Sequence, residues 1–140
     1  MSDEPILTGG CLCGGVRFEV SEPLQGAVYC HCKRCQRRTG SAFSMTAQTA
    51  PGSFRIVQGK ELDRHWRPDD GGWEKHFCAE CGSHLYTRNP NDPEQIGVRM
   101  GACDDDPGVR PGLRQFVTYA APWEPIPDDG LPRFPERRPS

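Results

Sequence analysis

Near the middle of the chain the sequence reads Cys78-Ala79-Glu80-Cys81-Gly82, which has the form of a zinc knuckle. Two thiolates three positions apart can reach one metal ion from a tight turn. The glycine that follows permits the backbone angles that such a turn needs. A closed structural zinc site has four ligands, so this pair requires two more from elsewhere in the chain.

A second pair of cysteines, Cys11 and Cys13, flanks Leu12 near the start of the chain and is followed by Gly14-Gly15. In an extended segment, residues i and i+2 place their side chains on the same face. The simplest combination joins both pairs around one Zn²⁺ and ties the start of the chain to its middle. The predicted ligands of this structural zinc are Cys11, Cys13, Cys78 and Cys81.

A third cluster reads Cys30-His31-Cys32-Lys33-Arg34-Cys35 and supplies three further cysteines. Three protein ligands and one open position are the arrangement of a catalytic zinc. Three thiolates on one Zn²⁺ leave a net negative charge, which nearby cations stabilise while they favour the thiolate form. The basic neighbours are Lys33, Arg34, Arg37 and Arg38.

Two alternatives to this division concern the cysteines themselves. Disulfides are one, but a bridge between residues i and i+2 strains the required geometry. The other is a second structural site, closed by His31 or by a distant histidine. The acidic start of the sequence has no apolar segment of a secretory signal, so we expect a cytoplasmic, reducing location, where clustered thiols are more often metal ligands.

Composition limits the classes of function. The 140 residues predict one domain, and a hydrophobic content of 35% with 16 glycines predicts a thin core. The net charge of -2 argues against nucleic acid as a partner, because dedicated nucleic-acid-binding domains are strongly basic. No apolar run approaches the roughly 20 residues that span a bilayer, so no membrane partner is expected.

Hydrophobic alternation predicts a mostly-β domain of short antiparallel strands. The clearest strand is Val16–Val20, where apolar and polar residues alternate. Glycine and proline together number 30, which interrupts the chain too often for long helices. A proline-rich, polar tail runs from Pro125 to Ser140 and is expected to lie extended over the surface or to fray. The further candidate strands are 43–47, Phe54–Gln58, Leu62–Trp66, Lys75–Phe77, Leu85–Arg88, Ile96–Met100 and Gln115–Tyr119.

The remaining reactive side chains have simpler interpretations. Cys103 is expected to be a small buried side chain at a strand end, and the three aspartates after it a solvated turn. His65 is expected on the surface or in the core rather than in a catalytic site. His76 and His84 flank the knuckle and therefore have more chance of lying near a metal.

These motifs together resemble the glutathione-dependent formaldehyde-activating (GFA) family, also called the CENP-V/GFA domain. The resemblance extends from about Gly9 to Phe134 and includes seven cysteines in order. The matching stretches are Gly9–Phe18, Cys30–Cys35, Gly40–Phe43, Phe77–Ser83, Ala121–Trp123 and Asp129–Pro132.

The resemblance implies a single domain over residues 1–140, with its core at about 9–134, a fold of the β-tent type and two zinc ions. It gives the structural zinc to the two paired cysteine motifs and the catalytic zinc to Cys30, Cys32 and Cys35. The implied activity is that of a carbon–sulfur lyase like S-(hydroxymethyl)glutathione synthase, which forms or breaks the adduct between glutathione and formaldehyde.

For this reaction we expect the substrates to be a small-molecule thiol and an aldehyde. Zinc favours the thiolate, which attacks the carbonyl carbon, and the developing alkoxide needs a proton or a cation. The candidates for this role are His31, Arg34, Arg37 and water, and Arg37 or Arg38 can guide an anionic thiol. Two other functions stay open: a non-catalytic, zinc-stabilised binding module, and a zinc hydrolase with another substrate.

Overall fold

The computed structural model describes residues 4–139, which form two β-sheets and one short helix. The helix α1 spans Lys33–Thr39, and the 3₁₀ turns η1, η2 and η3 span Lys60–Leu62, Met100–Ala102 and Val117–Tyr119. The strands are β1 Leu7–Gly10, β2 Arg17–Val20, β3 Ala27–Cys30, β4 Ser44–Gln48, β5 Phe54–Gln58, β6 Asp63–Trp66, β7 Glu74–Cys78, β8 His84–Asn89, β9 Asp92–Arg99, β10 Pro111–Gln115 and β11 Arg133–Phe134. The mostly-β prediction is therefore confirmed.

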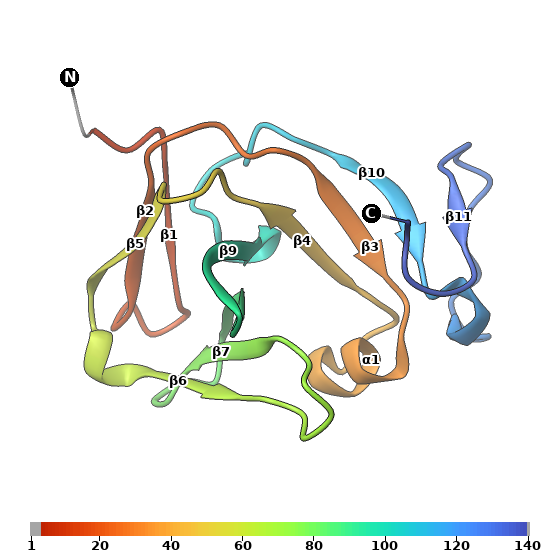
Figure 1. Cartoon of the computed structure of the whole chain (residues 1–140), viewed down its shortest axis with the longest axis horizontal. Coiled ribbons are helices and arrows are strands. Elements are labelled where there is room, and N and C mark those ends of the chain that lie inside the picture. Colours follow the sequence, from red (N-terminus) through yellow and green to blue (C-terminus); the bar gives the residue numbers. More distant parts are fainter. Residues whose placement is uncertain (1–3, 140) are drawn as a thin grey trace.

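The smaller sheet has the strand order β1-β2-β5, and the larger has the order β11-β10-β3-β4-β9-β8-β7-β6. In Figure 1 the small sheet stands opposite β3, β4 and β10, and β6 and β7 run beneath both. Most pairs are antiparallel, but β10 runs parallel to β3 and to β11. The expectation of antiparallel strands throughout is wrong at these two pairs, because long crossover segments let the chain return in the same direction.

The core lies between the two sheets, and the strand at Val16–Val20 shows how it is built. Val16, Phe18 and Val20 are fully buried, while the residues between them are partly exposed. The ring centroids of Phe18 and Phe54 are 5.3 Å apart, and those of Phe54 and Tyr86 on β8 are 4.6 Å apart. These aromatic contacts join the small sheet to the large one.

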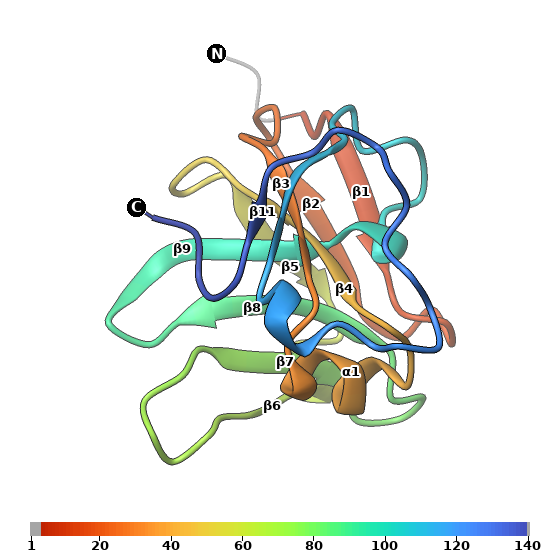
Figure 2. The ribbon, with the colours of Figure 1, turned by 90° about the vertical axis from the view of Figure 1, so that its right-hand side faces the viewer.

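Helix α1 is too short to be predicted from periodicity, and its ends are set by local chemistry. The Cys32 sulfur accepts the backbone N–H of Cys35 at 3.3 Å and caps the first turn. Gly40 ends the helix in the left-handed region, with a φ of 70°. The helix lies where the end of β3 approaches β7 (Figures 1 and 2), and the Arg38 guanidinium stands 5.6 Å from the Phe77 ring centroid.

The C-terminal part of the chain differs from the expected strand at Gln115–Tyr119. Strand β10 ends at Gln115, and the chain then turns through Phe116, with a φ of 59°, into η3. The tail crosses the surface and returns as β11 beside β10 (Figure 2). Buried Arg114 fastens it by donating to Asp129 Oδ2 at 2.7 Å. Among residues 4–139, no helix has the length and apolar character required to cross a membrane.

Candidate metal centres

The four-cysteine cluster comprises Cys11, Cys13, Cys78 and Cys81, whose sulfur atoms all lie within 4.8 Å of one another. The first pair lies in the loop between β1 and β2, and the second lies at the turn between β7 and β8. The sulfur–sulfur distances are 3.5 Å from Cys11 to Cys13 and 3.9 Å from Cys13 to Cys78. Tetrahedral zinc with Zn–S bonds of about 2.3 Å places its sulfurs about 3.8 Å apart, so the four thiols fit this ion.

Backbone groups of the loops hold these sulfurs in place. The Val16 N–H donates to Cys11 Sγ at 3.2 Å, and the Gly15 N–H donates to Cys13 Sγ at 3.4 Å. In the other loop, Gly82 has a φ of 78°, and its N–H donates to the Cys78 carbonyl at 2.8 Å. This left-handed conformation is the one for which glycine is suited.

Ser83 links the two loops of the four-cysteine cluster. Its hydroxyl oxygen accepts the Leu12 backbone N–H at 2.9 Å, and the same oxygen lies 3.2 Å from Cys81 Sγ. Hydrogen bonds from the hydroxyl and backbone N–H of Ser83 lower the pKa of Cys81 to about 5. The thiolate is therefore favoured at Cys81, one of the four candidate ligands.

The three-cysteine cluster comprises Cys30, Cys32 and Cys35, whose sulfurs also lie within 4.8 Å of one another. They come from the end of β3, the cap of α1 and its first turn. The Ser44 hydroxyl on β4 donates to Cys35 Sγ at 3.2 Å. Among the described residues, no fourth cysteine, histidine, aspartate or glutamate joins this group.

Basic side chains from α1, β7 and β9 lie near the three-cysteine cluster. Arg99 at the end of β9 is buried, and its guanidinium donates to Thr46 Oγ1 at 2.9 Å. Arg38 on α1 has two buried guanidinium nitrogens, Nε and Nη2, with no hydrogen-bond partner among residues 4–139. Burial lowers the pKa of Lys75 on β7, while the nearby charge of Cys35 raises it.

The charges in this cluster are strongly coupled. Hydrogen bonds from Cys30 and Cys32 hold the pKa of Cys35 far below its ordinary value, with help from Ser44 and Arg99 against the effect of burial. The same contacts raise the pKa of Cys30. These shifts favour the thiolate at Cys35, and the charge of Arg99 contributes to its stabilisation.

A cavity of about 620 Å³ lies beside the two cysteine clusters, with contacts to each that differ in kind. Its lining includes Cys11 of the four-cysteine cluster and Ser44, which contacts the three-cysteine cluster. Arg99 and His84 also line it. Burial lowers the pKa of His84 to about 4, with contributions from the charges of Arg38 and Arg99, so its imidazole is neutral at pH 7.

Residues 6–119 match the family described as "Glutathione-dependent formaldehyde-activating enzyme" (GFA). The chain belongs to the GFA family. It is 29% identical over 106 residues to a protein of Halomonas elongata named "Putative glutathione-dependent formaldehyde-activating enzyme", covering 72% of this chain and 68% of that protein. The fold is similar to a crystal structure of a Rhodobacter sphaeroides protein, with a TM-score of 0.60 and 25% identity, covering 91% of this chain and 98% of the other. The family expected from the cysteine motifs is thereby confirmed.

The other side chains that the sequence nominated in this GFA-family chain lie apart from the cavity. His31 is buried, and its Nε2 accepts a hydrogen bond from Arg114 Nη1 at 3.2 Å. Arg34 forms an ion pair with Asp70 at the surface, and Arg37 is exposed. The sequence did not nominate Arg99, which lines the cavity, or Lys75, whose pKa is affected by the charge of Cys35. His84, which was expected to have some chance of lying near a metal, also lines the cavity.

Cys103 and the acidic turn have local roles. Burial raises the pKa of Cys103 to about 11, and the charge of Asp104 adds to the shift, so this thiol stays protonated. Asp104 forms an ion pair with Arg17 on β2 and accepts a hydrogen bond from Thr8. The turn therefore fastens η2 to β1.

Proposed function

We propose that this GFA-family chain is a zinc-dependent carbon–sulfur lyase. It adds glutathione or a similar thiol to formaldehyde or another small aldehyde, and it catalyses the reverse reaction. The single observation that carries the proposal is the three-cysteine cluster, which has three ligands and contacts Ser44 in the lining of a cavity of about 620 Å³. This volume falls in the range of about 300–1,000 Å³ that small-molecule sites occupy.

Two zinc ions per chain complete the proposed enzyme, one in each cysteine cluster. Cys11, Cys13, Cys78 and Cys81 form the closed, structural site, and we assign the fold to the β-tent type that two such sites stabilise. Cys30, Cys32 and Cys35 form the open site, where a bound zinc supplies a Lewis acid that favours the thiolate of a substrate.

The surrounding side chains prepare the cavity for an anionic reaction. In the forward direction the thiol loses its proton, a carbon–sulfur bond forms at the carbonyl carbon, and the carbonyl oxygen takes up a proton. Arg99 lines the cavity and is assigned the stabilisation of the negative charge that develops on this oxygen. Arg38, whose buried Nε and Nη2 have no hydrogen-bond partner in the described part of the chain, is assigned to the excess negative charge of the thiolates. Ser44 orients Cys35 through its hydrogen bond.

The test is the rate of adduct formation from glutathione and formaldehyde, measured by NMR exchange with zinc-loaded protein. We expect acceleration over the uncatalysed reaction, and its loss in Cys32→Ala, which keeps the fold. A panel of thiols and aldehydes extends the test to related substrates. No acceleration with any pair contradicts the proposal, and favours the binding module if the zinc is also inaccessible to small thiols.

A further inference from the structure

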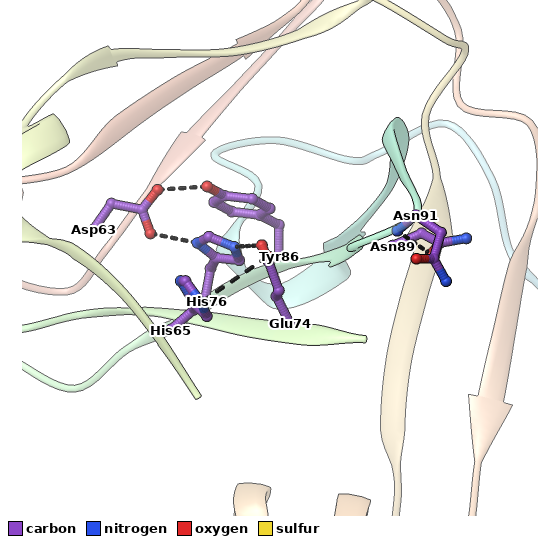
Figure 3. A network of polar contacts seen from close by, with 7 residues as sticks. All are labelled: Asp63, His65, Glu74, His76, Tyr86, Asn89 and Asn91. Atoms are coloured by element: carbon purple, nitrogen blue, oxygen red, sulfur yellow. Dashed lines mark hydrogen bonds and ion pairs between the residues drawn. The ribbon is translucent and has the colours of Figure 1, made fainter. Parts of the chain in front are cut away.

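A third group of metal-ligating side chains lies away from both cysteine clusters, on the hairpin of β6 and β7. His65 on β6 pairs with His76 on β7 in the strand register. Glu74 lies two residues before His76 and so projects from the same face of β7. Figure 3 shows the two imidazoles and the carboxylate turned toward one another.

The distances suit a shared cation. One ligand atom from each of the three side chains lies within 4.8 Å of the others. His76 Nε2 is 2.9 Å from Glu74 Oε1, and His65 Nε2 is 4.0 Å from Glu74 Oε2. Metal–ligand bonds of about 2.0–2.2 Å place neighbouring ligand atoms about 3 Å apart. His65 closes the remaining distance by rotation, because its side chain is 48% exposed.

An outer pair of side chains orients the buried imidazole. Asp63 Oδ1 lies 2.7 Å from His76 Nδ1, and the Tyr86 hydroxyl donates to the other oxygen of Asp63. The Tyr86 ring also stacks on His76, with centroids 4.2 Å apart. A carboxylate that accepts Nδ1–H and leaves Nε2 for the metal is the usual support of a metal-bound histidine.

We propose that His65, Glu74 and His76 form a third metal site, which binds a divalent first-row transition metal ion such as Zn²⁺ or Fe²⁺. Two imidazoles and one carboxylate, with the remaining positions open to water, are a donor set for these ions. The proton between His76 Nε2 and Glu74 leaves as the cation binds. The site opens to solvent on the side of His65, which gives a hydrated ion its way in.

The electrostatic surroundings are consistent with an anionic donor. Burial raises the pKa of the Glu74 carboxyl, but the hydrogen bond from His76 and the charges of His65 and Arg88 outweigh it, so the pKa is lowered. The pKa of Asp63 is lowered in the same way by His76 and Tyr86. Arg88 is the cation that competes with the metal here, and its guanidinium lies over the Tyr86 ring at 5.6 Å.

The test uses zinc-loaded protein dialysed to remove loosely bound metal and then titrated with Co²⁺. Cobalt bound by thiolates shows a sulfur-to-metal charge-transfer band, whereas cobalt bound by nitrogen and oxygen does not. We expect one Co²⁺ per chain to bind without this band. His65→Ala and Glu74→Gln should weaken this binding more than tenfold, and Asp63→Asn by about 10–100-fold through the orientation of His76.

Arg64→Gln is the matched control, because Arg64 neighbours His65 on β6 and its guanidinium donates to the Glu61 carbonyl instead. It should bind cobalt as the wild type does. Equal binding by the wild type and His65→Ala overturns the proposal. A charge-transfer band that accompanies all bound cobalt also overturns it, because the cobalt has then exchanged into the cysteine clusters. The absence of any cobalt binding overturns it too, and the three side chains are then an internal network of ion pairs. His65 is half exposed, so its removal leaves the fold intact for the comparison.

Discussion

The four-cysteine and three-cysteine clusters use the same ligand atom but span the chain differently. Cys13 and Cys78 are 65 residues apart: Cys13 lies in the loop between β1 and β2 of the small sheet, and Cys78 ends β7 of the large sheet. The three-cysteine cluster lies within residues 30–35, at one junction of strand and helix. Metal in the first cluster closes a long loop and joins the two sheets, whereas metal in the second constrains only a few residues. The first is therefore suited to holding the fold, and the second can be altered without losing it.

The groups that surround the two clusters also differ in kind. Backbone N–H groups of Gly15 and Val16 donate to sulfurs of the four-cysteine cluster. The three-cysteine cluster also has Arg99 and Arg38 nearby, and its contact Ser44 lines the cavity that Cys11 of the four-cysteine cluster lines as well. Fixed backbone donors stabilise thiolates locally, while side-chain cations beside a cavity can also act on a substrate. The contrast predicts separable effects on stability and on activity.

The largest expected effect is on stability, from Cys78→Ala. Cys78 is fully buried at the end of β7, and its loss opens the closed site. Zinc binding is worth ~10–16 kcal/mol in small zinc domains, while whole domains are stable by only ~5–15 kcal/mol. We expect insoluble protein, or a thermal unfolding temperature far below the wild-type value by circular dichroism. A variant as stable as the wild type would show that this cluster does not hold the fold.

The next effect is on activity, from Cys32→Ala. The variant should keep its circular dichroism spectrum and at least one zinc, because the ligands of the four-cysteine cluster are untouched. Its rate with glutathione and formaldehyde should fall to the uncatalysed level. If Cys32→Ala unfolds while Cys78→Ala stays folded, the roles of the two clusters are reversed.

A smaller effect distinguishes two adjacent arginines of α1. Arg38 is partly buried beside the three-cysteine cluster, whereas Arg37 is exposed. Arg38→Gln should lower kcat/KM about ten- to a hundredfold, because a hydrogen bond to a charged group is worth ~1.5–3 kcal/mol. Arg37→Gln is the matched control and should change it by less than about twofold, as exposed charges contribute little.

Steady-state kinetics at low and high salt also test whether Arg37 guides an anionic thiol. Guidance by an exposed charge weakens as salt rises, since screening acts over about 10 Å at 0.1 M ionic strength. Equal kcat/KM for Arg37→Gln and the wild type at both salts is the expected result. A salt-dependent loss with glutathione, and none with a neutral thiol, would instead assign the guidance of the anionic thiol to Arg37.

The smallest effect is expected for Ser44→Ala. It removes the hydroxyl that donates to Cys35 Sγ, a bond worth ~1 kcal/mol, and should lower kcat about fivefold. Ser41→Ala is the control, because Ser41 lines the same cavity but donates to the Phe43 carbonyl. Equal losses in both variants would indicate a general disturbance of the cavity rather than a contact with the cluster.

Sequence reasoning found what short-range spacing determines. The cysteines of the knuckle at 78–81 and of the cluster at 30–35 are close together in the sequence, so their spacing alone predicts that they meet. The alternation of apolar and polar residues in Val16–Val20 predicts which face of the strand is buried. Helix α1 was not predicted, because its seven residues are too few for a helical hydrophobic period and its start is set by the Cys32 cap. The parallel pairing of β10 with β3 was not predicted either, since no local sequence pattern shows beside which strand the chain returns after a long crossover.

The side chains that surround the sites could not be predicted from the sequence, because they are brought there by strand order and register. Arg99 reaches the three-cysteine cluster only because β9 lies beside β4. The sequence suggested Arg34 and Arg37, which are close along the chain but face Asp70 and solvent. His65 meets His76 through the register of β6 and β7, which no spacing of histidines along the chain specifies.

The difference in role between the clusters is tested most directly by removing metal from the wild-type protein. A chelator is added to zinc-loaded protein, and zinc release, activity and circular dichroism are followed together in one sample. The three-cysteine site has one ligand fewer, so its zinc should leave first and take the activity with it while the spectrum stays unchanged. The second zinc should leave later, together with the fold. Release of both ions in one phase with simultaneous unfolding, or loss of the fold before loss of activity, would contradict the account.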